Sequence, residues 1–371
     1  MKRSEPVFIL RTSSYENLKE LSCLLKDLLP PLQGKKVLIK PNILAPRKPE
    51  EGVTTHPSIC EKVIESVLEK GGTPVVGDCP GVSGYGACEK AAEVAGIKKV
   101  SGNFFVNFAK EAKRVPIKSR FFSEITVSKI CLEVDYIINL PKFKTHALTY
   151  FTGAVKNMFG IVAGGDKALT HRNAPSRDEF AEAILDIFSL RPPDLTIMDG
   201  IVAMEGNGPS GGKLVNLGVV LVSKDHLAID AVMGLITDID PFTLPIVRKG
   251  IERKIGNPDP EKIPIEGKLP THRNFKMPST YYFSATSPFA YLINRFVFPS
   301  FTGEKLTFLK NKCNKCSICI KECPAGAMKK GEDEFPRIDK KICINCYCCM
   351  ELCPNQAWVL GGFINRLRKW F

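Results

Sequence analysis

The chain has 371 residues, of which 44% are hydrophobic and 25% are charged, so it can bury a sizeable core and exceeds one average domain. This composition excludes a disordered chain, and no apolar run reaches the length of a membrane span. The formal net charge of +13 favours anionic partners. The apolar stretch at 7–10 is too short for a signal-peptide core, so we expect a cytoplasmic protein.

The first part of the chain alternates short apolar runs with helical patterns. Its predicted strands are the runs at 7–10, 35–40, 73–78, 135–140, 194–199 and 218–223. Three helices are predicted. One runs from Tyr15 to Leu29, one follows the motif THP, and one follows the capping box formed by Ser176 and Glu179. This alternation predicts an α/β domain with a mostly parallel sheet over residues 1–275.

Polar side chains follow several of these strands, and ligands of such sheets gather beyond the carboxyl ends of the strands. Lysines suit the binding of a carboxylate or phosphate, asparagines can orient it, and histidines can donate protons near neutral pH. The predicted substrate-binding side chains are Lys40, Asn42, Lys156 and Asn157. The predicted catalytic side chains are Lys142, Lys144, His146 and His56.

Each of these positions also has a structural alternative, because a single lysine or histidine is more often solvated or structural than catalytic. Function is favoured for the group after the strand at 135–140, where Lys142, Lys144 and His146 follow one another at alternate positions. A weaker hypothesis is an additional mononuclear metal site, built from His56, His146, Asp78 and Asp199.

Nine of the fourteen cysteines lie between Cys313 and Cys353. There the pattern Cys-x2-Cys-x2-Cys-x3-Cys-Pro occurs twice, starting at Cys313 and at Cys343. Three thiolates at this spacing bind three corners of one iron–sulfur cube, while the fourth reaches the other cluster. One predicted [4Fe–4S] cluster is therefore held by Cys313, Cys316, Cys319 and Cys353. The other is held by Cys343, Cys346, Cys349 and Cys323.

A pair of zinc sites is the alternative interpretation. Zinc sites do not require three evenly spaced cysteines followed by Cys-Pro, whereas this pattern occurs twice here. Cys348 breaks the spacing, so we expect it not to be a ligand. Residues 308–358 resemble the bacterial ferredoxins with two [4Fe–4S] clusters, and this resemblance implies a small α+β domain.

The motifs KPN, THP, PKFKTH, TGAVKNMFG and MEGNGP resemble those of a widespread family of domains of unknown function that often carries a two-cluster ferredoxin module. The resemblance covers nearly the whole chain. It implies the two-domain architecture, the iron–sulfur content and a motif-bearing cleft. It implies no particular reaction.

Two segments flank the predicted ferredoxin domain. Residues 276–307 are rich in aromatic side chains and are predicted to dock this domain on the first one. Residues 359–371 read as a basic amphipathic tail, for which packing on the protein is favoured over contact with anionic lipid. Residues 310–371 hold 12 Lys plus Arg against 6 Asp plus Glu, so this region is expected to face an acidic redox partner or its own first domain.

Two nucleotide-binding motifs are rejected. The glycines of 206–211 formally fit a dinucleotide fingerprint, but a strand-like run follows where a helix is required, and no phosphate-binding P-loop is present. The basic residues are spread without interleaved aromatics, so no nucleic-acid binding is predicted. The sequence favours an iron–sulfur reductase that delivers low-potential electrons, received from a donor protein, to a small anionic substrate. The alternative is a ferredoxin-like electron carrier whose first domain only binds a partner.

Overall fold

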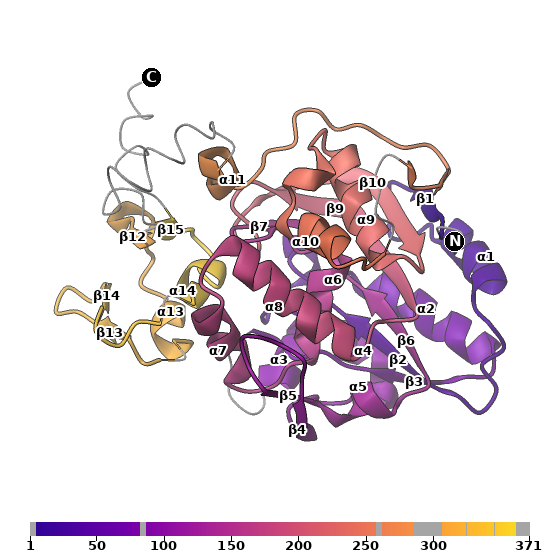
Figure 1. The fold of residues 1–371 in the computed structure, drawn as a ribbon, viewed down its shortest axis with the longest axis horizontal. Helices are drawn as coiled ribbons and strands as arrows, with labels where there is room; N and C mark the ends of the chain where they lie inside the picture. The colour runs from indigo at the N-terminus through magenta and orange to yellow at the C-terminus, as the bar shows by residue number, and fades with distance from the viewer. Residues whose placement is uncertain are drawn as a thin grey trace.

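In the computed structural model, a large α/β domain carries a small second domain on one side (Figure 1). The structure describes residues 5–81, 87–256, 262–284, 306–323, 325–344 and 346–360. No helix within these ranges is long and apolar enough to cross a membrane.

A nine-stranded sheet forms the centre of the large domain, with seven strands in the order β11-β1-β10-β9-β6-β2-β3 and with β7 and β8 attached beside β9. Five of its strand pairs are parallel and three are antiparallel, which confirms the predicted mostly parallel α/β fold. The strands are β1 (Val7–Arg11), β2 (Lys36–Pro41), β3 (Thr73–Val76), β6 (Tyr136–Leu140), β7 (Lys142–His146), β8 (Tyr150–Phe151), β9 (Leu195–Glu205), β10 (Lys213–Ser223) and β11 (Ile265–Glu266). A separate antiparallel hairpin joins β4 (Ala112–Pro116) and β5 (Glu124–Ser128).

Helices cover both faces of this sheet (Figure 1). Successive residues of a strand point to opposite faces, so Leu38 of β2 packs with α8 while its neighbours Val37 and Ile39 pack with α1 and α2. The helices of the domain are α1 (Lys19–Leu28), α2 (Pro57–Glu69), α3 (Ala87–Val94), α4 (Ile97–Ser101), α5 (Lys129–Glu133), α6 (Ala154–Asn157), α7 (Asp166–Asn173), α8 (Arg177–Leu190), α9 (His226–Ile236), α10 (Pro245–Glu252) and α11 (Ser279–Ser284).

Two local predictions differ from the structure. The helix expected from Tyr15 begins only at Lys19, and the Tyr15 side chain instead reaches into the large domain, where its hydroxyl bonds to Asp199. The segment 142–146, predicted only to follow a strand, itself forms β7 because it pairs in parallel with β9. The predicted capping box is present, since Ser176 Oγ accepts from the Glu179 N–H and the Glu179 carboxylate accepts from the Ser176 N–H.

The second domain is a small α+β unit in which the cysteine repeat is visible in the backbone. Ser317 and Tyr347 each follow the second cysteine of a repeat, each adopts the left-handed conformation, and each starts a one-turn helix. These helices are α13 (Ile318–Lys321) and α14 (Cys348–Glu351). The strands β12 (Leu306–Phe308) and β15 (Trp358–Leu360) form one antiparallel pair, and β13 (Met328–Lys330) and β14 (Pro336–Ile338) form another.

The beginning of the predicted docking segment lies against the large domain. Thr280 Oγ1 donates to the carbonyl of Ala147 over 2.6 Å, and the ring of Tyr281 meets that of Tyr150 edge-on at 5.1 Å. Residues 285–305 of this segment and residues 361–371 of the predicted tail lie outside the described residues, whereas 306–307 belong to β12 and 359–360 to β15 of the small domain.

Candidate functional site

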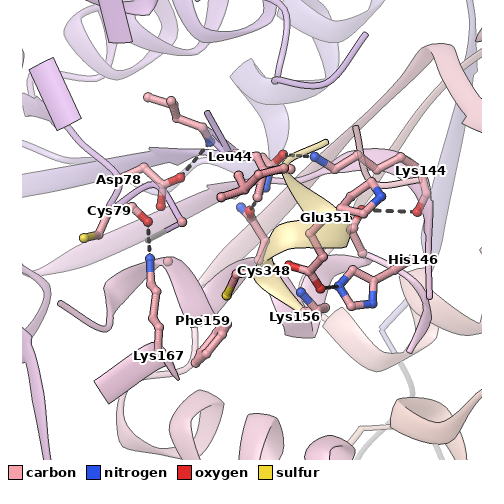
Figure 2. A pocket seen from close by; sticks show the side chains of 18 of the residues that line it. Leu44, Asp78, Cys79, Lys144, His146, Lys156, Phe159, Lys167, Cys348 and Glu351 are labelled. Carbon is pink, nitrogen blue, oxygen red and sulfur yellow. Dashed lines mark hydrogen bonds and ion pairs between the residues drawn. The ribbon is translucent and has the colours of Figure 1, made fainter. Parts of the chain in front are cut away.

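A cavity of about 80 Å³ lies between the two domains, and Figure 2 shows the side chains around it. The segments after β2 and β3, the end of β7, the segment 152–160 and helix α7 form its wall in the large domain. Helix α14 of the small domain closes it. The predicted residues Asn42, Lys144, His146, Lys156 and Asn157 all line this cavity.

Alternate residues of β7 explain how lysine and histidine come to share one side of a buried strand. Phe143 faces the hydrophobic core between the sheet and α9. Lys142, Lys144 and His146 therefore occupy the opposite side, at every second position. A register shift between Lys142 and Lys144 in the pairing with β9 separates the first lysine from the other two residues.

Lys40 does not line the cavity, but it forms a buried ion pair just behind the wall. Its Nζ lies 2.7 Å from Oδ1 of Asp78, a cavity-lining residue, and both side chains are at most 3% exposed. Burial lowers the pKa of Lys40, and the charge of Asp78 partly offsets this shift. Gly160 passes so close that a Cβ there would lie 2.0 Å from Asp78 Oδ1 and 2.5 Å from Lys40 Nζ.

Lys144 is held by uncharged groups. Its Nζ donates to Oδ1 of Asn42 over 2.7 Å and to the carbonyl of Val53 over 2.5 Å. Burial lowers the pKa of Lys144 well below its ordinary value, and the charges of Lys156 and Lys142 lower it further.

His146 and Glu351 form a direct contact between the domains at the cavity (Figure 2). His146 Nε2 lies 2.7 Å from Oε1 of Glu351 on α14. His146 Nδ1 accepts from the backbone N–H groups of Leu148 and Thr149, so the neutral ring carries its proton on Nε2, toward the carboxylate. Burial and the charge of Lys156 lower the pKa of His146 to about 4.

Other basic groups surround the same cavity. Burial lowers the pKa of Lys156, which lies over the rings of Phe159 and Phe180 at 5.8 Å and, among the described residues, has no hydrogen-bond acceptor. His171 stacks on Phe180 at 4.3 Å, and its buried Nδ1 has no hydrogen-bond partner in the described part of the chain. Lys167 donates to the backbone carbonyls of the segment after β3. The cavity therefore holds more basic than acidic side chains.

Lys142 and His56 belong to a separate network that does not line this cavity. Lys142 Nζ lies 2.8 Å from Asp199 Oδ2 and donates to the Tyr15 hydroxyl over 2.8 Å. The His56 ring stacks on Tyr15 at 3.7 Å, its Nδ1 caps α2 by accepting from the Ser58 N–H, and its own backbone N–H donates to Asp199. The polar groups of Lys142 and Asp199 are therefore occupied by contacts inside the large domain.

The four residues of the hypothetical mononuclear metal site do not come together. Asp78 pairs with Lys40, Asp199 with Lys142 and His146 with Glu351. Within the described residues, no three His, Cys, Asp or Glu side chains converge closely enough to hold a single metal ion. In a [4Fe–4S] cube each thiolate binds a different iron, so its four sulfurs are spread around a core rather than gathered on one ion.

Four cysteines that the spacing assigns to one cluster lie together in the small domain. A cavity of about 20 Å³ is lined by the four thiols of one set, Cys313, Cys316, Cys319 and Cys353. Burial raises the pKa of Cys319 to about 11, with contributions from the other three thiols of this set. Burial also raises the pKa of Cys349, and the neighbouring thiols that contribute are Cys346, Cys343 and Cys323 of the other predicted set together with Cys319 of the first. Four thiols around a hollow are the donor set that a [4Fe–4S] cluster requires, and the first predicted set has this arrangement.

Helix α14 connects the second set of cysteines to the cavity between the domains. Cys349 is a predicted cluster ligand, whereas Cys348 and Glu351 line the cavity. The Cys348 thiol is 5% exposed and donates to the carbonyl of Cys346 over 3.8 Å. One turn of helix thus joins a predicted cluster ligand to the cavity wall.

Comparison with known proteins identifies both domains. Residues 37–234 match the family described as a domain of unknown function, DUF362, over more than half of the sequence. The protein belongs to the DUF362 family. Residues 305–354 match a 4Fe-4S dicluster domain, so this DUF362 protein is the predicted fusion of the two.

Relatives of this DUF362 protein include a thylakoid-associated protein of Synechocystis, 35% identical over 249 residues, which are 64% of this chain and 76% of that protein. One subunit of the anaerobic dimethyl sulfoxide reductase of Escherichia coli is 45% identical over 52 residues, which are 14% of this chain and 25% of that subunit. The lactate racemase apoprotein of Thermoanaerobacterium thermosaccharolyticum covers 60% of this chain and 54% of its own, at 13% identity and a TM-score of 0.39. The matched dicluster domain and its similarity to a reductase subunit support an iron–sulfur electron-transfer role.

Sequence reasoning missed part of the cavity of this DUF362 protein. Glu351 received no role, although its place beside Cys349 in the repeat was a signal that it lies near a cluster. Cys79 also lines the cavity, and a hydrogen bond with Cys88 together with the charge of Lys167 lowers its pKa to about 6. Cys79 and Cys88 lie apart from the ligand pattern, so no spacing indicated their contact.

Proposed function

We propose that this DUF362 protein is an iron–sulfur reductase that holds two [4Fe–4S] clusters and acts on a small anionic substrate in the cavity between its domains. The observation that carries this proposal is helix α14, in which Cys348 and Glu351 line the cavity next to Cys349, a predicted cluster ligand. Such clusters, when bound, supply single electrons at potentials set by their surroundings.

The proposed ligands are those of the repeat. Cys313, Cys316, Cys319 and Cys353 would hold the first cluster. Cys343, Cys346, Cys349 and Cys323 would hold the second. The first set includes the exposed Cys316, and exposed lysines such as Lys312, Lys315 and Lys321 lie near it in the sequence, which favours an acidic protein as the redox partner on this side.

Within the cavity, the proposed anion-binding groups are the basic side chains that no carboxylate of the large domain neutralises. Lys156 has no hydrogen-bond acceptor among the described residues and is partly buried. A bound carboxylate or phosphate would therefore supply the acceptor for its ammonium group. Asn42 and Asn157 also line the wall of the cavity, where they would orient the bound anion. His146 is neutral near pH 7 and carries its proton on Nε2 at the same surface, so it can donate a hydrogen bond there.

Lys142 and His56 receive a different proposed role from the one predicted for them. Their polar atoms pack against Tyr15 and Asp199 rather than facing the cavity. We assign them to stabilising the large domain.

The first test is the iron and acid-labile sulfide content of anaerobically purified protein, with an EPR spectrum of the dithionite-reduced sample. Eight iron and eight sulfide per protein molecule are expected for the two proposed clusters. The reduced protein is then mixed with a panel of small anions (glyoxylate, nitrite, sulfite and fumarate) while cluster oxidation is followed by absorbance.

The matched variants are Lys156→Gln in the cavity and Lys26→Gln on the exposed face of α1. Lys156→Gln is expected to slow oxidation by an accepted anion at least tenfold at unchanged iron content, and Lys26→Gln to leave it unchanged. Should Lys156→Gln alter only the binding of a partner protein, the carrier function replaces the reductase. Zinc in place of iron would exclude both functions.

A further inference from the structure

Three lysines of the large domain are completely buried, and they differ in what neutralises them. Lys40 is paired with Asp78 and Lys142 with Asp199, each at 2.7 to 2.8 Å. Lys144 is 0% exposed and, among the described residues, has no carboxylate within ion-pair distance. An unpaired buried ammonium is costly, so such a group is expected to be neutral.

A series of asparagines fixes the direction of the hydrogen bond at Lys144. The carbonyl of Ala154 can only accept, so Asn139 turns its amide nitrogen toward it and its oxygen toward Asn157. Asn157 then presents its oxygen to the Asn42 nitrogen over 3.0 Å. The Asn42 oxygen is left facing Lys144, where it must accept.

The Lys144 nitrogen therefore has two partners that can only accept, the Asn42 oxygen and the Val53 carbonyl. A neutral amine has two N–H groups, which these acceptors use completely, and one lone pair. Lys144 also lines the cavity. The charged groups that act on it are Lys142, Lys156, Asp78 and Glu351, and the two lysines lower its pKa together with burial.

We propose that Lys144 captures the carbonyl carbon of a small anionic aldehyde or 2-oxo acid as an imine, which would give this cavity a covalent substrate-binding function. The inference rests on the proposed function, since it names the substrate class of the same cavity. Lys156, which has no hydrogen-bond acceptor among the described residues, would pair with the anionic end of the molecule. A cavity of about 80 Å³ suits a molecule of a few heavy atoms.

The step balances without an oxidant or a reductant. The Lys144 nitrogen forms a bond to the carbonyl carbon, the carbon–oxygen bond breaks, and both amine hydrogens leave with the oxygen as water. Water reverses the step and releases the molecule. Reduction of the carbon–nitrogen bond itself would leave a secondary amine that water cannot cleave, so the imine holds the substrate while chemistry occurs elsewhere on it.

The test uses glyoxylate as the probe on the cluster-loaded protein at pH 7, with cyanoborohydride to convert any imine to a stable adduct and peptide mass spectrometry to locate it. At this pH only about one in 2,500 ordinary lysine side chains is neutral. Lys144 is therefore expected to carry at least tenfold more adduct than Lys156 or any exposed lysine. Acetaldehyde, which lacks the carboxylate, is expected to label it several-fold less.

Asn42→Asp is the matched variant, because it keeps the size of the side chain and places a carboxylate against the amine. It is expected to protonate Lys144 and reduce the labelling at least tenfold at unchanged iron content. Equal labelling of Lys144 and exposed lysines in the wild-type protein would overturn the proposal. Anion-dependent cluster oxidation without labelling would retain the reductase and reject the imine, whereas labelling without such oxidation would do the reverse.

Discussion

Glu351 of helix α14 places its carboxylate 2.7 Å from Nε2 of His146 at the end of strand β7. The carboxylate therefore belongs to the small domain and the imidazole to the large one. Because Glu351 lies between Cys349 and Cys353 in the second cysteine repeat, this contact ties the predicted cluster ligands to the cavity wall. The contact also places one negative charge in a cavity of otherwise mainly basic character.

Glu351→Gln is expected to tighten the binding of a small anion such as sulfate by about a hundredfold. At an effective dielectric constant near 20, removing one charge at about 5 Å is worth roughly 3 kcal/mol. Calorimetric titration with sulfate at low salt measures the effect, with iron content checked in parallel. Glu332→Gln, on the exposed surface of the same domain, is the control and is expected to change nothing. Equal sulfate affinity in all three proteins would show that Glu351 does not compete with anions.

Gly160→Ala is expected to destabilise the large domain by roughly 3–5 kcal/mol, the usual cost of disrupting a buried ion pair. The added Cβ would lie 2.0 Å from Asp78 Oδ1, so Lys40 and Asp78 cannot keep their present contact. Gly165→Ala meets no atom within 4 Å and is expected to cost less than about 1 kcal/mol. Thermal unfolding followed by circular dichroism compares the two variants. A small effect at Gly160 would mean that the pair can move without cost.

Tyr15→Phe is expected to lower stability by about 1–3 kcal/mol, because the hydroxyl bonds to Asp199, Lys142 and the Val202 N–H inside the domain. The same variant is expected to leave the glyoxylate labelling of Lys144 unchanged, since this network does not line the cavity. Unfolding and labelling are measured on one preparation. A tenfold loss of labelling would place the Tyr15 network in the functional site after all.

The buried His226 is expected to make stability depend on pH. Burial lowers its pKa to about 4, while the unfolded protein has the ordinary value near 6.5. Between these values the unfolded state binds more protons than the folded state. The contribution of His226 to the free energy of unfolding is therefore fully present above about pH 6.5, and it decreases by at most about 3 kcal/mol as the pH drops toward 4. His146 and His171, whose pKa values burial also lowers to about 4, act in the same direction.

His226→Gln isolates this contribution, because a glutamine can still bond to Thr196, the present partner of the ring at 2.8 Å. The gap between the thermal midpoints of the wild-type protein and the variant is expected to narrow as the pH falls from 6.5 to 5. His272→Gln, at a partly exposed position, serves as the control. A gap that stays constant over this range would contradict the assignment.

The amino-acid sequence determined what depends on local pattern. Short apolar runs predicted six of the nine strands of the sheet, the capping box at Ser176 set the start of α8, and the spacing of the cysteine repeat predicted the four thiols that line one cavity of the small domain. Spacing suffices for the cysteines because three ligands of each set lie within seven residues, where the local backbone fixes their separation.

Only the tertiary structure decided which lysines face the cavity. Lys142 and Lys144 are two residues apart, yet one pairs with Asp199 and the other with Asn42, because a register shift in β7 and distant segments supply their partners. The same holds for Glu351, whose contact with His146 depends on how two separately patterned domains pack. Desolvation and pairing between residues far apart in the sequence set the charge of these groups, and such contacts have no local signature.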